Sequence, residues 1–112
     1  MRDKIVHLIN KLIERNSKKD MFWSKTSSDS EFKTTINKAT ITIEKWNDED
    51  GENFEFCLYN SNGEKIEEIH IMESQVDDNI QLLKNLYNSA VENYFKVDET
   101  IDGIIDSLNN EF

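Results

Sequence analysis

Residues 54–72, FEFCLYNSNGEKIEEIHIM, contain the clearest structural signal in the chain, because two alternating runs flank a tight-turn dipeptide. Phe54–Tyr59 places large apolar side chains at every second position, as a strand with one buried face does. Lys65–Met72 resumes the alternation after the Asn62-Gly63 pair. Because Asn and Gly both tolerate a positive φ, this pair favours a type I′ turn. The stretch therefore predicts an antiparallel β-hairpin.

The same period of two occurs earlier in the chain. Residues 31–36 and 39–44 each place apolar or β-branched side chains on one face. The alternation changes parity at Asn37-Lys38, so we expect a turn or bulge there. The acidic, glycine-containing segment 47–53 then leads into the hairpin. Together these runs predict a three- or four-stranded antiparallel meander.

Helical periodicity flanks the predicted strands on both sides. Residues 2–16 predict an amphipathic helix, since apolar side chains recur there at three- and four-residue intervals. A second helix is predicted from a cap at Ser74 or Asp77 to about Lys96. A third follows Asp98, with four apolar side chains that we expect to face the core: Ile101, Ile104, Ile105 and Leu108.

These elements predict one α+β domain that spans residues 1–112. It consists of an N-terminal helix, a three- or four-stranded antiparallel meander and two C-terminal helices. Packing all the helices on one face of the sheet is the economical way to bury their apolar stripes. The other face of the sheet then meets solvent or a partner.

Charge is distributed unevenly along the chain. Residues 1–25 carry seven Lys/Arg and three Asp/Glu, whereas residues 26–112 carry six and twenty. The resulting net charges of +4 and −14 give the −10 of the whole chain. A field of one sign selects partners of the other sign and repels polyanions. We therefore expect a protein partner with a basic surface, and no direct binding to nucleic acid or membrane.

The chain contains one cysteine, Cys57, and no proline. A single cysteine excludes an intrachain disulfide, and its position on a predicted strand favours a buried thiol. No apolar run approaches the ~20 residues of a membrane span, and the first residues lack the pattern of a signal peptide. Abundant Asn, Ile and Lys indicate A/T-rich coding. These features predict a soluble, cytoplasmic protein of a low-GC bacterium or its phage.

No pattern of residues indicates catalysis, a cofactor or a metal. Asp48–Gly51 matches part of a calcium-binding loop, but this alignment leaves Trp46 and Cys57 at positions that need oxygen ligands. His70 and Glu68 share a predicted strand face, yet two ligands alone do not form a metal site. The chain also lacks a Gly-rich phosphate loop and a nucleophile–base signature. We expect a non-enzymatic protein without catalytic, metal or cofactor-binding residues.

Two groups of acidic residues are the candidate partner-binding residues. One group lies in the predicted turn at 47–53, and the other lies on the last predicted helix, where aspartates recur every four residues. This spacing places the aspartates on one helix face, which is either simply solvated or an acidic recognition strip. The eight candidates are Asp48, Glu49, Asp50, Glu52, Asp98, Glu99, Asp102 and Asp106.

Three classes of function are consistent with these observations. The leading hypothesis is a small acidic protein-interaction domain that acts by stoichiometric binding. One form of it is an inhibitor or immunity-type protein that masks a basic site on its partner. The second is a structural or assembly protein that self-associates, for example as a homodimer, through the basic first helix and the acidic body. The third is a small-molecule-binding α+β domain with a pocket near Trp23, Trp46 and Tyr59.

Overall fold

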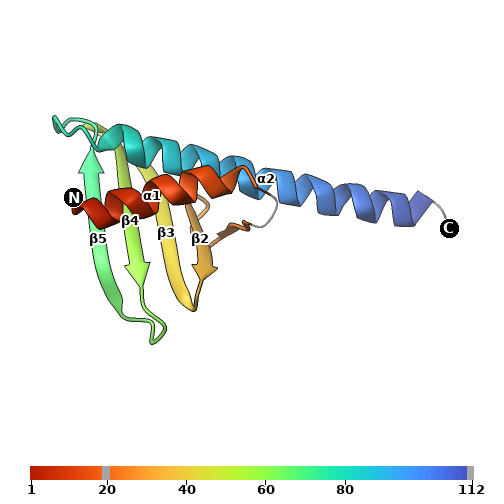
Figure 1. Cartoon of the computed structure of the whole chain (residues 1–112). Helices are drawn as coiled ribbons and strands as arrows, with labels where there is room; N and C mark the ends of the chain where they lie inside the picture. Colours follow the sequence, from red (N-terminus) through yellow and green to blue (C-terminus); the bar gives the residue numbers. More distant parts are fainter. Residues whose placement is uncertain (19–20, 111–112) are drawn as a thin grey trace.

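The computed structural model describes residues 1–18 and 21–110, which form an α+β fold with a long protruding helix (Figure 1). An N-terminal helix precedes five strands, and a second helix follows them. The strands form one antiparallel sheet in the sequential order β1-β2-β3-β4-β5. The elements are α1 (Asp3–Asn16), β1 (Ser24–Lys25), β2 (Glu31–Ile36), β3 (Ala39–Asp48), β4 (Gly51–Tyr59), β5 (Lys65–Met72) and α2 (Ile80–Asn110).

The predicted antiparallel meander is confirmed, but its strand count differs from the three or four expected. The fifth strand is β1, a two-residue strand that pairs with β2 through Ser24↔Lys33 and Lys25↔Phe32. Sequence patterns do not indicate this strand, because two residues are too few to show an alternation. Their pairing is nevertheless regular, since Thr26 N–H also donates to the Glu31 carbonyl.

The turn predicted at Asn37-Lys38 is confirmed, and it has the type I′ conformation that the sequence predicts for Asn62-Gly63 instead. Asn37 and Lys38 have φ values of 51° and 67°, and they connect the paired residues Ile36 and Ala39. Two consecutive positive φ angles are what a type I′ turn requires. By contrast, the predicted Asn62-Gly63 turn lies within a longer connection between β4 and β5. There only Gly63 has a positive φ, at 80°.

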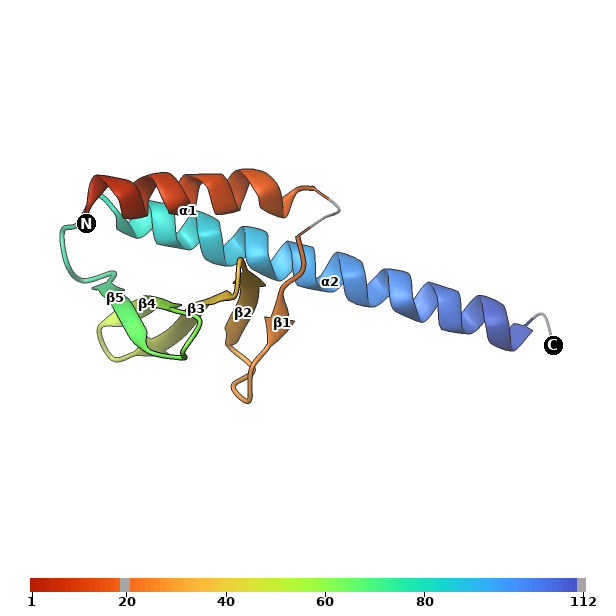
Figure 2. The same ribbon diagram turned by 60° about the horizontal axis from the view of Figure 1, so that its bottom comes forward.

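The core lies between the sheet and the two helices, which both pack on one face of the sheet (Figure 2). Phe32 of β2 and Phe54 and Phe56 of β4 point toward the helices, and each is at most 2% exposed. Tyr87 of α2 lies edge-on to Phe32 and Phe54, with ring centroids 5.8 and 6.2 Å apart. Truncating a buried Phe costs about 3–5 kcal/mol, so this cluster accounts for much of the stability.

The two predicted C-terminal helices are one continuous helix, which corrects the predicted count. α2 runs from Ile80 to Asn110, and the predicted boundary near Lys96 lies inside it. No proline or glycine occurs between Ile80 and Thr100, so nothing in the backbone interrupts the helix there. The predicted start at Ser74 or Asp77 is also too early. The Asp77 side chain accepts a hydrogen bond from the Asn79 N–H just before the helix begins.

Candidate partner-binding surface

The second half of α2 extends past the sheet into solvent (Figures 1 and 2). We name residues 97–110 the helical extension. A 31-residue helix is about 46 Å long at 1.5 Å per residue, longer than the strands beneath it. Every residue from Asp98 to Asn110 is exposed. The helical extension is therefore a free-standing helical surface in the isolated chain.

The apolar stripe of the helical extension continues the face of α2 that packs in the core. Leu83, Leu86 and Ala90 on the first half are fully buried. Further along, the same face of the helix carries four apolar residues at spacings of three and four: Val97, Ile101, Ile104 and Leu108.

Along the helical extension this stripe has no cover from the described residues. Ile104 is 56% exposed and Leu108 is 54% exposed. The prediction that Ile101, Ile104, Ile105 and Leu108 face the core is therefore wrong. The prediction fails because the sheet ends before this part of the helix.

An acidic row runs along one side of this apolar stripe. Asp98, Asp102 and Asp106 are spaced four residues apart, and at 3.6 residues per turn they lie on average about 130° around the helix from the centre of the stripe. Glu99 adds a fourth carboxylate, and residues 97–110 contain no Lys or Arg. The opposite flank carries small side chains at Thr100, Gly103 and Ser107. The helical extension thus combines an apolar stripe with one acidic flank.

The base of the helical extension borders a cavity of about 710 Å³ between α2 and the segment after α1. Its apolar lining comes from Met21, Phe22, Val97 and Ile101. Phe22 is 61% exposed, so the apolar surface continues from the helical extension onto the body. The structure buries Met21 and Trp23 but leaves Phe22 at the surface.

A buried polar network fixes the point where α2 leaves the body. Asn93 donates to the carbonyl groups of Asn16 and Met21, at 3.1 and 2.7 Å, and its Oδ1 accepts the Trp23 N–H. The Trp23 indole donates to Asn16 Oδ1 at 2.6 Å. Asn16 in turn donates to the Ser89 hydroxyl. Because buried amides must be paired, this network sets the position of α2 four residues before the helical extension begins.

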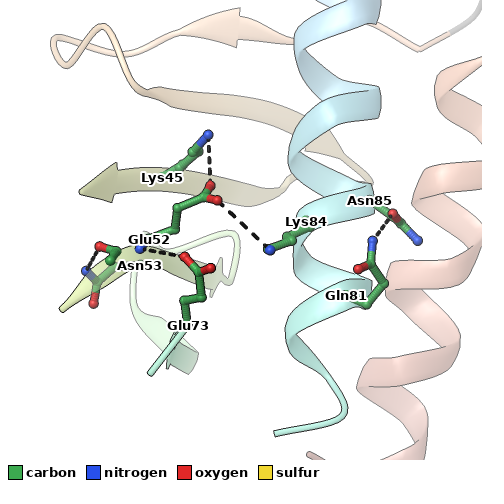
Figure 3. Close-up of polar contacts among 8 residues, drawn as sticks. Lys45, Glu52, Asn53, Glu73, Gln81, Lys84 and Asn85 are labelled. Carbon is green, nitrogen blue, oxygen red and sulfur yellow. Dashed lines mark hydrogen bonds and ion pairs between the residues drawn. The ribbon is translucent and has the colours of Figure 1, made fainter. Parts of the chain in front are cut away.

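The other predicted acidic group lies on the β3–β4 hairpin. Asp48, Glu49 and Asp50 are exposed, but the Glu52 carboxylate lies between two ammonium groups (Figure 3). It contacts Lys45 Nζ at 2.9 Å and Lys84 Nζ at 4.0 Å. The hydrogen bond from Lys45, together with both positive charges, lowers the pKa of Glu52 below its ordinary value. Glu52 therefore connects the hairpin to α2, and its charge is largely neutralised within the chain.

The structure does not bring the two acidic groups together. Glu52 pairs with Lys84, which is 18 residues before Asp102 along α2. At 1.5 Å per residue, this is a separation of about 27 Å along the helix axis. A single standard interface centred on the helical extension would leave the hairpin at or beyond its edge. The two groups are separate surfaces.

The three aromatic residues of the predicted small-molecule pocket do not converge. Trp23 belongs to the buried network on the helix side of the sheet. Trp46 lies on the other face and stacks on His70, with ring centroids 5.0 Å apart. Tyr59 lies on that outer face too, but its partner in the sheet is Thr40, six residues along β3 from Trp46. No common pocket joins them.

Comparisons with protein-family models, with curated proteins and with solved structures found no match to this chain. No helix among the described residues is long and apolar enough to cross a membrane.

Proposed function

We propose that this protein is a non-enzymatic interaction module that binds a partner protein through the helical extension. The observation that carries this proposal is the apolar stripe that leaves the core and continues uncovered beside an acidic row. Amphipathic helices place such stripes against another element. The partner that fits is an amphipathic helix, or a groove, whose apolar face is flanked by Lys and Arg.

The apolar stripe can supply most of the binding free energy. Burying an Ile or Leu side chain contributes about 1.5–3 kcal/mol relative to leaving it exposed. Ile101, Ile104, Ile105 and Leu108 are each roughly half exposed, so a partner that covers them gains only the exposed part of that contribution. The acidic row selects the partner and speeds association, as rim charges generally do.

Charge favours a different protein over a second copy of this chain. The helical extension has four acidic side chains and no basic one, so two such helices packed together would bring like charges into proximity. A basic partner removes that repulsion. An inhibitor or immunity-type protein that masks a basic functional surface is the form of this function that the charge pattern supports best.

A designed helical peptide tests this proposal directly. The probe carries Leu at the two core positions of each heptad and Lys or Arg at the flanking positions, and a matched peptide carries Glu at the flanks. We expect the basic peptide to bind in fluorescence anisotropy, with an affinity that falls as salt increases. Equal binding of the two peptides would contradict the electrostatic part of the proposal.

Matched variants locate the binding surface. The double variant Ile101→Ser/Ile104→Ser should abolish binding, and Asp98→Asn/Asp102→Asn/Asp106→Asn should weaken it and reduce its salt dependence. The control is Asp48→Asn/Glu49→Gln/Asp50→Asn, which removes the same amount of charge from the β3–β4 hairpin. If the control loses as much binding as the aspartate triple variant, the helical extension is not the site.

Light scattering of the isolated protein decides between a different protein and a second copy. We expect a monomer across the concentration series, because the acidic rows oppose pairing of two helical extensions. A dimer that persists on dilution and dissociates in Ile101→Ser/Ile104→Ser would show that the occupant is a second copy.

A further inference from the structure

The face of the sheet away from the helices holds a cluster of potential metal ligands on β4 and β5. Cys57 and Glu68 are direct partners across these two strands, and Glu55 lies two residues before Cys57 on the same face. A sulfur or carboxylate oxygen from each of these three residues lies within 4.8 Å of the others. Sequence patterns did not indicate this cluster, because its ligands come from two strands whose register the patterns do not specify.

The separations in the cluster suit a small divalent cation. Tetrahedral zinc, with bonds of about 2.3 Å to sulfur and about 2.0–2.2 Å to oxygen, places its ligand atoms about 3.3–3.8 Å apart. Cys57 Sγ already lies 3.7 Å from Glu55 Oε1. Glu68 is an exposed, flexible side chain, so a rotation can bring its oxygen from within 4.8 Å to ligand distance.

A buried hydroxyl lies beside the thiol on the same face of the sheet. Thr42 pairs with Cys57 across β3 and β4 on the same face, and the residue is 7% exposed. Its Oγ1 is buried and has no hydrogen-bond partner among the described residues. A buried hydroxyl without a partner carries a cost of about 1–3 kcal/mol. The Cys57 sulfur interacts with this hydroxyl, and a metal-bound thiolate would accept its hydrogen bond more strongly than a thiol does.

The surrounding charges favour an added cation at this position. Glu31, Glu44 and Glu55 lie directly opposite one another on β2, β3 and β4. Like charges in such cross-strand pairs are destabilising. The nearby cation is the Lys65 ammonium, which lies 3.5 Å from a Glu68 oxygen.

We propose that Glu55, Cys57 and Glu68 bind a divalent cation of zinc type, with the Thr42 hydroxyl donating a hydrogen bond to the coordinated sulfur. A thiolate ligand selects zinc-like ions over Mg²⁺ and Ca²⁺, which prefer oxygen ligands. On binding, the Cys57 S–H bond breaks, its proton passes to solvent and a sulfur–metal bond forms without any redox change. The ion displaces the Lys65 ammonium from Glu68, and water fills the fourth position.

A titration of the full chain with Co²⁺ tests this site, because Cys57 is the one cysteine in the sequence and thus its one source of a thiolate ligand. Thiolate ligation gives an intense sulfur-to-cobalt charge-transfer absorption in the near ultraviolet, which carboxylate or imidazole ligation does not. We expect this band to saturate at one ion per chain and to disappear when excess Zn²⁺ is added. A titration without the band would overturn the proposal.

Four variants test the individual groups. Cys57→Ser should remove the band, and Glu68→Gln should weaken binding. Thr42→Val removes the donor to the coordinated sulfur and should lower affinity by ~10-fold, in the range for groups that hydrogen-bond to metal ligands. Lys65→Gln should raise affinity, since it removes the competing cation. The control Asp102→Asn, on the helical extension, should leave metal binding unchanged.

The outcomes of this series distinguish a specific metal site from adventitious binding at the surface. Circular dichroism establishes that each variant is folded before it is titrated. If zinc binds Cys57→Ser as tightly as the natural chain, or if His7→Gln alone abolishes binding, the ion is held adventitiously at the surface and the proposal fails. Neither result bears on peptide binding by the helical extension, which shares no residue with this cluster.

Discussion

The two halves of α2 have the same apolar periodicity but entirely different surroundings. Leu83, Leu86 and Ala90 on the first half are completely buried, whereas Ile101 and Ile104 on the helical extension are about half exposed. Both sets of residues lie on one helical face. The comparison shows that periodicity identifies which face of a helix is apolar, while the length of the neighbouring sheet determines whether that face is covered within the same chain.

The largest difference between the halves of α2 should appear in the free energy of unfolding when one large apolar side chain of the stripe is truncated in each half. We expect Leu86→Ala to lower the free energy of unfolding by about 2–5 kcal/mol, because Leu86 is fully buried. Ile104→Ala should change it by no more than about 0.5 kcal/mol, since Ile104 is 56% exposed. Urea denaturation followed by circular dichroism measures both. Similar losses in the two variants would show that the helical extension is packed in solution.

The junction between the halves offers a second test. Asn93→Ala removes the partners of the Trp23 N–H and of the Asn16 and Met21 carbonyl groups. Each buried group left unpaired costs about 1–3 kcal/mol, and a water molecule that enters the vacated space can offset part of this cost. We therefore expect a destabilisation of about 2–3 kcal/mol by thermal unfolding. Asn109→Ala, on the exposed helical extension, is the matched control and should have little effect.

A smaller effect is expected at Gly103, inside the helical extension. A Cβ at this position would meet no atom within 4 Å, and glycine in a helix interior costs about 1 kcal/mol relative to alanine. Gly103→Ala should therefore raise helicity and slow amide hydrogen exchange in residues 97–110. Because the helical extension makes few contacts with the body, global stability should change less than local protection does. An equal change in both would show that the two halves unfold together.

The smallest effect concerns pH and the ion pairs of the first half. Hydrogen bonding from Lys45, with the charges of Lys45 and Lys84, lowers the pKa of Glu52 in the folded protein below its value of 4.5 in the unfolded chain. The stability contributed by Glu52 is therefore present above pH 4.5 and is lost as the pH falls through the folded pKa. Natural protein and Glu52→Gln should differ in melting temperature at pH 7 and converge at low pH.

Glu44 provides a control of opposite sign for that experiment. Burial, followed by the charge of Glu31, raises its pKa in the folded state. Ionisation of Glu44 therefore opposes folding, and this effect appears as the pH rises through 4.5 toward the folded pKa. Glu44→Gln should thus be more stable than the natural chain at pH 7, with no such gain at pH 3. If Glu52→Gln and Glu44→Gln changed the stability at pH 7 in the same direction, the opposite pKa shifts of Glu52 and Glu44 would be contradicted.

Local sequence patterns predicted the α+β class, the antiparallel meander and the burial of Cys57. They did not predict β1, because Ser24 and Lys25 are too few residues to form a pattern. A turn or bulge at Asn37-Lys38 was predicted and is confirmed, but the two positive φ angles of a type I′ turn were expected at Asn62-Gly63 and occur at Asn37-Lys38. Lys38 is an unusual residue for this turn, and the short connection between β2 and β3 imposes that conformation on it.

Sequence reasoning identified the acidic residues of the candidate site but not its apolar stripe. Asp98, Asp102 and Asp106 are recognisable from their spacing alone. Ile104 and Leu108 were assigned to the core, because a sequence pattern does not show where the sheet ends. Near Leu83 the stripe has apolar residues on both flanks, such as Leu82 and Tyr87, whereas near Ile104 aspartates lie on one flank. This change is the signal that could have revealed the exposure.

Hydrogen-exchange mass spectrometry with and without the basic amphipathic peptide tests the central claim most directly. In the free protein, amides of residues 97–110 should exchange faster than those near Leu86, because the helical extension lacks tertiary packing. On peptide binding, protection should increase in residues 97–110 and leave the β3–β4 hairpin unchanged. Protection that appears at the hairpin, or an unchanged helical extension in a saturated complex, would contradict the proposal that this helix is the binding surface.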